Sequence, residues 1–218
     1  MNIKILYHGS VKMIKTPIFG YGRTDNDFGR GFYCTEDIEL AREWAALDEN
    51  GGFVNQYELD LSGLKCLDLT DGEYNELSWM AILLANRTVR CSSPIEKRAR
   101  AFITEYYMPD TSQADIIIGH RADDSCFSFA RAFLSNTITL QQLSTALGLG
   151  NLGIQIMLKS ERAFKALNYK KAEPVDGRIY YPQRMMRDKR ARDQYMALLE
   201  EADETGTYIN DIIKMGGL

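Results

Sequence analysis

The stretch 27–35 (DFGRGFYCT) constrains the fold of this chain more than any other, because it places a glycine hinge before a strand and a helix. Gly29 and Gly31 sit one residue apart, which lets the backbone adopt positive φ values or approach another segment closely. The two aromatic residues that follow predict a short strand. Thr35 and the acids after it are typical of a helix N-terminus, so we expect a helix to begin there. A glycine-hinged strand that runs into a helix is a common way to build the wall of a ligand cleft.

Length and composition limit the class of protein. A chain of 218 residues with 45% hydrophobic content is long enough for one full core. The sequence has no apolar run long enough for a transmembrane helix, and its N-terminus lacks the pattern of a signal peptide. The 4 cysteines are widely spaced without a Cys-x-x-Cys pair, which favours buried, reduced thiols over a zinc site. A net charge of −4 indicates no general attraction to nucleic acid. We therefore expect a soluble, cytoplasmic protein.

Apolar periodicity predicts an α+β fold in which helices are inserted between strands. Short apolar or alternating runs predict strands at residues 3–7, 53–60, 65–69, 115–119 and 154–158. We expect the strand at 65–69 to pair with the strand at 53–60, because a Ser-Gly turn separates them. Apolar residues at helical spacing predict helices at residues 37–47, 75–87, 94–107, 126–134, 140–147 and 161–167. Residues 11–30, which are polar and contain several glycines, are expected to form a loop that reaches over another part of the molecule.

The composition changes near Asp176, where six basic residues crowd a short span. We therefore divide the chain into residues 1–175 and a helical extension at residues 176–218 that packs on the same domain. A charge run of this kind is usually a solvated helix face. Its alternative interpretation is a surface that docks an acidic partner or RNA.

Three segments far apart in the sequence share the motifs of a known superfamily. Residues 6–10 (LYHGS) resemble the first motif of ADP-ribosyltransferases of the diphtheria-toxin and poly(ADP-ribose) polymerase type, and residues 28–33 (FGRGFY) resemble their second motif. Trp44 follows Tyr33 by 11 residues, which is the interval to the second aromatic of those enzymes. Gln155, on a late predicted strand, is the best match to their third motif.

Residues from about 4 to 170 look like an uncharacterised bacterial family grouped with that superfamily. The resemblance implies a split mixed and antiparallel sheet, with NAD as the co-substrate and no metal. It also implies that the His8 side chain binds a ribose hydroxyl and the Gly9 backbone holds the nicotinamide amide. Tyr33 and Trp44 would sandwich the nicotinamide, and Gln155 would hold its ribose. The catalytic residues implied are His8, Tyr33 and Gln155. The NAD-binding residues implied are His8, Gly9, Ser10, Arg30, Gly31, Phe32, Tyr33 and Trp44.

The third motif departs from the most active members, which carry glutamate where this chain has Gln155. A neutral amide orients the ribose but places no negative charge beside the cation that develops there. At an effective dielectric near 20, a charge about 4 Å away contributes about 4 kcal/mol, on the order of a thousandfold in rate. Gln155 therefore favours slow or single-unit transfer, or an acid supplied from elsewhere. The candidates for that acid are Glu161, Asp123 and Asp124.

The first hypothesis is an NAD-dependent mono-ADP-ribosyltransferase, a glycosyltransferase that acts on an intracellular macromolecule. In this family setting it would be a bacterial toxin or effector with a neutralising antitoxin protein as its partner. The alternatives are an inactive module that binds NAD or an ADP-ribosylated ligand, and an enzyme that removes an RNA 2′-phosphate. Each site residue also has a plain interpretation. His8 would be a strand-end hydrogen bonder, Tyr33 and Trp44 core residues, and Arg23 and Arg30 solvated loop charges rather than ligands of the NAD pyrophosphate.

Overall fold

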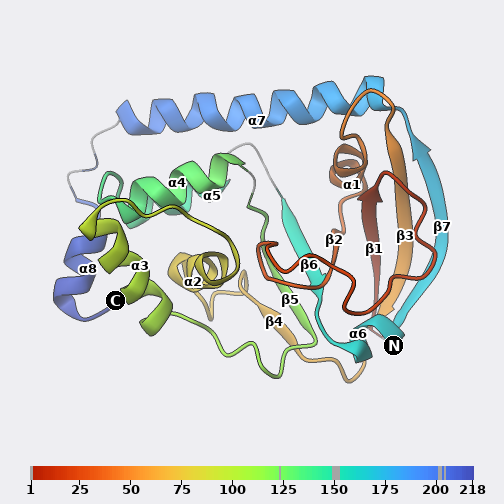
Figure 1. Cartoon of the computed structure of the whole chain (residues 1–218), viewed down its shortest axis with the longest axis horizontal. Coiled ribbons are helices and arrows are strands. Elements are labelled where there is room, and N and C mark those ends of the chain that lie inside the picture. Colours follow the sequence, from red (N-terminus) through yellow and green to blue (C-terminus); the bar gives the residue numbers. More distant parts are fainter. Residues whose placement is uncertain (1, 123, 149–152, 201–202, 204) are drawn as a thin grey trace.

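Two β-sheets stand side by side and helices flank them, in a computed structural model that describes residues 2–122, 124–148, 153–200, 203 and 205–218 (Figure 1). The first sheet is antiparallel, with the order β1 (Ile3–Ser10), β3 (Gly52–Asp60), β7 (Leu167–Val175). The second sheet has the order β2 (Phe32–Cys34), β6 (Ile154–Leu158), β5 (Ile116–His120), β4 (Cys66–Asp68). Only its β4–β5 pair is parallel among the described strands. The predicted α+β class is confirmed.

The two sheets meet at one point and then diverge. Tyr7 of β1 and Thr35, directly after β2, form an isolated antiparallel bridge whose two backbone hydrogen bonds measure 2.8 and 2.9 Å. On the far side of this bridge β2 pairs with β6, and Tyr33 lies opposite Met157. The strands of the two sheets therefore part next to the glycine hinge, and this split positions the candidate site.

Helices pack around the second sheet because their apolar faces need cover. The chain forms α2 (Glu76–Asn86), α3 (Pro94–Tyr106), α4 (Asp124–Leu134) and α5 (Leu140–Gly148) between β4 and β6. The Asn75 side chain caps α2, and Ser93 with Glu96 forms a capping box on α3. The main core, with Trp79, Phe129 and Phe133 almost fully buried, lies among these helices. The short α1 (Ile38–Ala45) lies against β1 and β3, and α6 (Glu161–Lys165) precedes β7.

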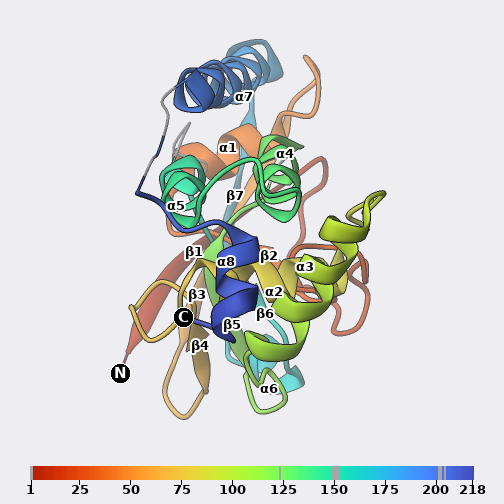
Figure 2. The ribbon, with the colours of Figure 1, turned by 90° about the vertical axis from the view of Figure 1, so that its left-hand side faces the viewer.

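The C-terminal segment belongs to the same packed body. The long α7 (Gly177–Glu200) crosses above α1 and above α4 and α5, as two perpendicular views show (Figure 1, Figure 2). The Tyr195 ring of α7 contacts the Phe129 ring of α4, with centroids 4.3 Å apart. α8 (Ile209–Met215) contributes Ile209 and Ile212 to the main core. None of the helices in these ranges has both the length and the hydropathy that a membrane span requires.

The structure corrects the predicted strand pairing. β4 does not pair with β3 but lies parallel to β5 in the other sheet. β7 was not predicted, because its sequence (LNYKKAEPV) is largely polar and contains Pro174. Both features are typical of an edge strand, where lysine and proline discourage pairing with another chain. β1 also runs through His8 to Ser10 rather than ending at residue 7.

Two smaller predictions are also corrected. The cap of α1 is Asp37 rather than Thr35, because the Asp37 carboxylate accepts hydrogen bonds from the backbone N–H groups of Glu39 and Leu40. Thr35 instead accepts a hydrogen bond from the Asp37 N–H. The cysteines do not all behave as buried apolar residues, since Cys34 is buried but Cys66 is exposed.

Candidate functional site

A cleft of about 470 Å³ opens where the two sheets separate. Pockets of this size are typical of small-ligand sites. The cleft collects residues from β1, the loop after it, β2, α1, β6, α6 and the segments that follow α2 and β5. Its described lining residues are His8, Ile14, Pro17, Ile18, Tyr21, Gly22, Asn26, Asp27, Gly31, Phe32, Tyr33, Trp44, Arg87, Arg121, Ala122, Gln155 and Phe164. One cavity is therefore lined by five of the residues that the motifs indicated, namely His8, Phe32, Tyr33, Trp44 and Gln155.

The loop after β1 forms one side of this cleft, and the buried Asn55 side chain hydrogen-bonds to its backbone. The Asn55 carboxamide of β3 accepts a hydrogen bond from the Ile14 N–H at 2.7 Å and donates to the His8 carbonyl at 3.2 Å. The Tyr57 hydroxyl donates to the Ile14 carbonyl at 2.5 Å. The prediction that this loop reaches over another part of the molecule is confirmed, because Ile14 and Ile18 line the cleft. The role of Asn55 was not predicted, since its partners lie some forty residues away.

His8 has a defined tautomer. Its Nδ1 lies 2.6 Å from the Tyr33 carbonyl oxygen, and because a carbonyl only accepts, Nδ1 carries the proton. The ring also packs against Phe32, with centroids 4.4 Å apart. Burial lowers the pKa of His8, so the imidazole is neutral near pH 7. The remaining nitrogen, Nε2, is then a hydrogen-bond acceptor, the group that a ribose hydroxyl needs.

Tyr33 presents a fixed ring to the cleft. Its hydroxyl donates to the Gly29 carbonyl at 2.7 Å and accepts from the Phe28 N–H at 3.1 Å, which closes the hinge on itself. Gly29 has φ +84°, a conformation that other residues rarely adopt. A Cβ on Gly31 would lie 2.2 Å from the Met157 sulfur, so this glycine lets β2 approach β6. Burial raises the pKa of Tyr33, and its phenol therefore stays protonated.

Trp44 brings a second aromatic ring to the cleft from α1. Among the described residues, its Nε1 is buried and has no hydrogen-bond partner. A buried donor left without a partner is unusual and calls for an explanation. The Arg121 guanidinium lies over the same ring, 5.3 Å from its centroid. Trp44 therefore contributes an aromatic ring to the cleft, while its own N–H lies buried behind the cleft surface.

Gln155 is buried and bonded to an acid that the sequence analysis did not select. Its Nε2 donates to Asp27 Oδ2 at 2.9 Å and to the His120 carbonyl at 3.4 Å. Because both partners engage the amide nitrogen, Oε1 is the atom that can accept a hydrogen bond from a ligand. Asp27 is 6% exposed and also accepts from the Ala122 N–H at 3.0 Å. The feature of the sequence that points to Asp27 is its position two residues before Gly29, the first glycine of the hinge.

Asp27 is a buried acid whose surroundings act on its pKa in opposite directions. Burial raises the pKa of Asp27, while the hydrogen bonds from Gln155 and Ala122 and the positive charges of Arg87 and Arg121 lower it. Arg87 Nη1 lies 3.4 Å from Asp27 Oδ1. The hydrogen bonds and the guanidinium charges favour the ionised carboxylate. Burial is the largest of these effects, so the pKa of the acid directly behind the Gln155 amide lies above its ordinary value.

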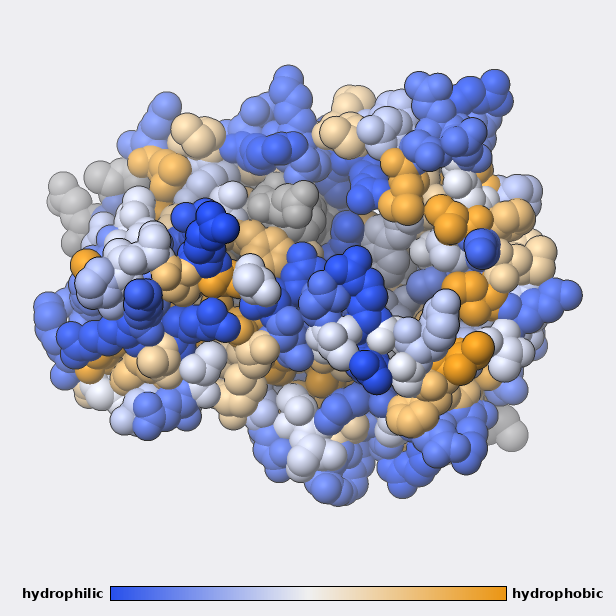
Figure 3. Space-filling view, viewed as in Figure 1, coloured by the Kyte–Doolittle hydropathy of each residue, from blue (hydrophilic) through white to orange (hydrophobic). Residues whose placement is uncertain are grey.

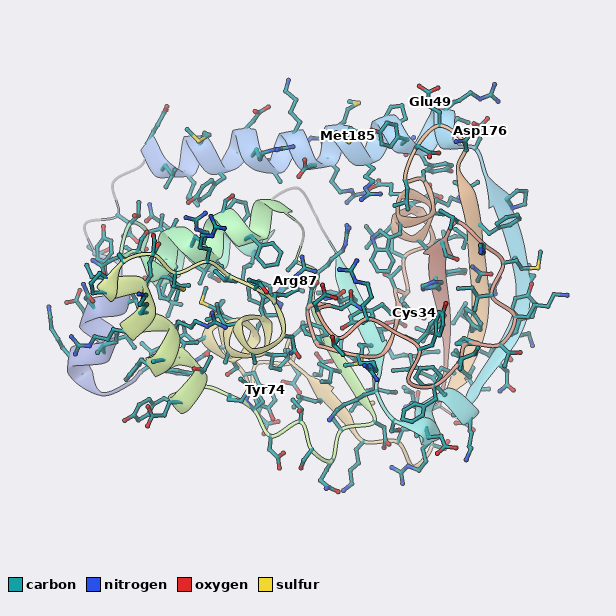
Figure 4. All side chains as sticks on the ribbon, in the orientation of Figure 1. Cys34, Glu49, Tyr74, Arg87, Asp176 and Met185 are labelled. Carbon is teal, nitrogen blue, oxygen red and sulfur yellow. The ribbon has the colours of Figure 1, made fainter. Side chains whose placement is uncertain are left out.

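Two arginines give the cleft an excess of positive charge. Arg87, labelled in Figure 4, lies between the end of α2 and the N-terminal loop, with its guanidinium 4.5 Å from the Phe127 ring centroid. Arg121 follows β5 and lines the same cleft. Guanidinium groups bind phosphate oxygens well because their N–H donors match that geometry. Arg87 was not predicted, because it lies at a helix C-terminus with no motif around it.

Three residues that the resemblance implied are outside the cleft lining. A Cβ on Gly9 would lie 2.0 Å from the Ala41 carbonyl, so Gly9 serves the packing of β1 against α1. The Ser10 hydroxyl donates to the Lys12 carbonyl at 2.6 Å. Arg30 is exposed. These three residues therefore do not contribute side chains to the cleft, and Arg23, paired with Asp25 at 2.6 Å, is likewise an exposed loop charge.

None of the acids expected to replace a glutamate at position 155 is described as part of the cleft lining. Glu161 forms an exposed ion pair with Lys165 at 2.8 Å and does not line the cleft. Asp123 lies outside the described residues, as does the side chain of Asp124. The acid that contacts Gln155 in the structure is instead Asp27. Within the described part of the chain, no cluster of three or more histidine, cysteine or acidic side chains is arranged to hold a metal ion.

Comparison with known proteins gives one family. A family model described as "Protein of unknown function (DUF3990)" matches residues 4–169. No match was found among curated proteins or among solved structures. The matched region contains both sheets except Ile3 of β1 and most of β7, and it includes the described residues that line the cleft. The chain therefore belongs to the DUF3990 family.

Proposed function

We propose that this protein is an NAD-dependent mono-ADP-ribosyltransferase built on an ADP-ribosyltransferase-like split sheet. The observation that carries the proposal is that His8, Tyr33, Trp44 and Gln155 line a single cleft at the point where two sheets part. The cleft offers two aromatic rings, a neutral imidazole acceptor, an amide acceptor and two guanidinium groups. These are the groups that a nicotinamide, two riboses and a pyrophosphate require.

The reaction breaks the bond between the nicotinamide nitrogen and C1 of its ribose. The electron pair leaves with neutral nicotinamide, and C1 becomes electron-poor until a nucleophile of the acceptor attacks it and loses its proton. The Tyr33 ring, held by its hydroxyl, stacks on the nicotinamide, a contact worth roughly 1–3 kcal/mol in nucleotide sites. His8 Nε2 accepts from a ribose hydroxyl, and Arg87 with Arg121 faces the pyrophosphate. These contacts orient the bond before it breaks.

Asp27 and Gln155 act together on the developing positive charge. Gln155 Oε1 accepts from the hydroxyl next to C1, and Asp27 holds the amide in that orientation through the 2.9 Å hydrogen bond. The ionised Asp27 carboxylate also places a negative charge near C1, separated from it by the Gln155 amide. At roughly 8 Å and an effective dielectric near 20 it contributes about 2 kcal/mol, or roughly 30-fold in rate. The chain thus recovers part of what a glutamate at position 155 would supply, and slow transfer of a single unit is expected.

The test is to incubate the protein with NAD labelled in its adenylate part and to measure nicotinamide release and label transfer in a cell extract. Tyr33→Ala removes the stacking ring, so we expect release to fall about tenfold or more. Tyr33→Phe keeps the ring but loses the two hydrogen bonds that hold it, so its rate of release should lie between those of the wild type and Tyr33→Ala. Tyr106→Ala, an exposed tyrosine on α3, is the matched control. Folded wild-type protein that releases no nicotinamide and transfers no label would end the enzyme proposal.

The second candidate is a binding module that holds NAD without cleaving it. The neutral amide of Gln155, in the position of a catalytic glutamate, favours it. In that case NAD raises the melting temperature of the wild-type protein and not of Tyr33→Ala, while no nicotinamide appears. Turnover by the wild-type protein excludes this candidate. The resemblance also extends the first proposal to a bacterial toxin or effector with a neutralising protein as its partner.

A further inference from the structure

A second hollow of about 280 Å³ lies beside the cleft, between α1 and α7. Its described lining residues are Glu43, Arg121, Arg184, Met185, Arg187, Asp188 and Arg192. Met185, labelled in Figure 4, marks its place along α7. Arg121 lines both this hollow and the cleft, so the two spaces are neighbours across one guanidinium group. We call this hollow the arginine pocket.

Part of the charge in the arginine pocket has a structural purpose. Glu43 of α1 is 5% exposed, and both of its carboxylate oxygens accept from Arg187 at 2.7 Å. This bidentate pair ties α7 to α1 and satisfies a buried acid. Asp188 pairs with Arg192 on α7 itself. The four guanidinium groups nevertheless outnumber the two carboxylates, so the pocket keeps an excess of two positive charges.

The positive charge continues along α7. Residues 184–192 contain five basic residues and one acid, and Lys189, Arg190 and Arg192 are exposed. Hydrophilic side chains occupy much of this upper edge of the molecule, with a few apolar ones between them (Figure 3). Arg184 and Arg192 are separated by about 12 Å of helix at 1.5 Å per residue. That length matches several nucleotides at about 3.4 Å each, which favours a strand with repeated phosphates over a single phosphorylated side chain.

The net charge of −4 does not oppose this assignment. Charges are screened beyond about 10 Å at 0.1 M salt, so a ligand on α7 responds to the local arginines rather than to the distant acids. Guanidinium groups bind phosphate through paired N–H donors, and an arginine-lined hollow presents several such donors at once. The chemical class that fits the pocket is therefore a phosphodiester.

We propose that the arginine pocket binds a backbone phosphate of a single-stranded nucleic acid, which is the acceptor for the cleft beside it. The acceptor role rests on the proposed transferase function. Arg121 joins the two spaces and lies over the Trp44 ring, so a strand held in the pocket places its next nucleotide at the cleft. A nitrogen or oxygen of that nucleotide then bonds to C1 of the ribose, nicotinamide leaves with the electron pair of the broken bond, and the proton of the nucleophile passes to solvent.

The first experiment measures binding without NAD, so its result does not depend on catalysis. The probes are fluorescent single-stranded RNA and DNA of 12 nucleotides, followed by anisotropy at several salt concentrations. The wild-type protein should bind one or both, with an affinity that falls as salt rises. Arg184→Gln and Arg192→Gln should each lower the affinity and reduce the salt slope by about one. Arg178→Gln removes the same charge from α7 outside the pocket and should bind like the wild type. Equal binding by all three variants, or no binding, overturns the pocket assignment.

The second experiment measures where the label goes. With labelled NAD and the strand that binds, the label should appear on the nucleic acid for the wild type and Arg178→Gln, and be reduced several-fold for Arg184→Gln and Arg192→Gln. A strand with neutral methylphosphonate linkages should neither bind nor receive label. Label that passes only to protein overturns the acceptor assignment, while nicotinamide release by the wild type without any strand still supports the transferase. Absence of that release refutes the proposed function itself, and the binding result is then judged alone.

Discussion

Replacing Gln155 by glutamate tests the coupling between this residue and Asp27. In the native protein the Gln155 Nε2 lies 2.9 Å from Asp27 Oδ2, so Gln155→Glu turns an attractive contact into a pair of facing carboxylates. Two charges about 4 Å apart at an effective dielectric near 20 repel by about 4 kcal/mol. At 1.36 kcal/mol per unit, this separates the two ionisations of the pair by about three pH units. The variant therefore keeps one shared proton near pH 7, so a glutamate at position 155 does not simply raise the proposed activity.

We expect the rate of nicotinamide release by Gln155→Glu to depend on pH in the neutral range differently from that of the native protein. Nicotinamide release by Gln155→Glu should rise with pH through the neutral range, as the shared proton leaves and the negative charge beside C1 increases. The double variant Asp27→Asn with Gln155→Glu removes the facing charge, so its carboxylate ionises normally. This double variant should be the faster of the two at pH 6 to 7 and should show no rise with pH there. Gln113→Glu, at an exposed position, is the control and should keep the native profile.

The coupling between the two carboxyl groups should also make the free energy of unfolding of Gln155→Glu fall as pH rises. A carboxyl whose folded pKa lies above its unfolded value contributes stability at low pH that is lost as pH rises through the folded pKa. The free energy of unfolding of Gln155→Glu should therefore fall between about pH 5 and pH 8, relative to the double variant, in urea melts followed by circular dichroism. A flat pH profile for Gln155→Glu in both rate and stability would refute the coupling. So would a double variant that is no faster than the single one.

Three further predictions concern single positions. Burial lowers the pKa of His8, so its contribution to stability is present above pH 6.5 and is lost as pH falls through the lowered pKa. NAD binds the folded protein, so its affinity measured by calorimetry should stay constant from pH 8 to below 6.5 and weaken only as pH approaches the lowered pKa of His8. His8→Gln should remove this dependence. Trp44→Phe deletes the buried, unpartnered N–H and keeps an aromatic ring at the cleft, so neither thermal stability without NAD nor NAD affinity should fall in melting and calorimetry experiments. Gly31→Ala should lower the free energy of unfolding by about 2 kcal/mol or more in denaturant melts, because its Cβ would overlap a β6 side chain. Gly148 has open space around it, so the control Gly148→Ala should be nearly neutral or stabilising.

Local patterns in the chain predicted most of the elements near the site. The glycine hinge, the aromatic pair after it and the following helix were all recognisable because each depends on neighbours within a few residues. Gly29 adopts positive φ and Gly31 allows close approach, as their spacing indicated. Strand β6 was predicted with its observed bounds from a short apolar run. The α1 helix was placed within two residues at each end.

Pairings over long separations were less predictable. A strand's apolar pattern shows that it needs a partner but not which sheet edge is open, so β4 was assigned to the wrong neighbour. β7 escaped prediction because an edge strand has little buried surface and its polar sequence resembles a loop. The motifs suggested a shared site for His8, Tyr33 and Gln155, but the residues behind that site carry no motif.

The sequence by itself determined where most of the short strands and helices near the site begin, and it indicated several of the residues that line the cleft. Only the tertiary structure decided that the Gln155 amide rests on Asp27, 128 residues earlier in the chain, with Arg87 beside it. The physical reason is that torsional preferences and apolar periodicity act between near neighbours. The orientation of an amide and the ionisation of a buried acid instead depend on whichever groups folding brings within about 4 Å.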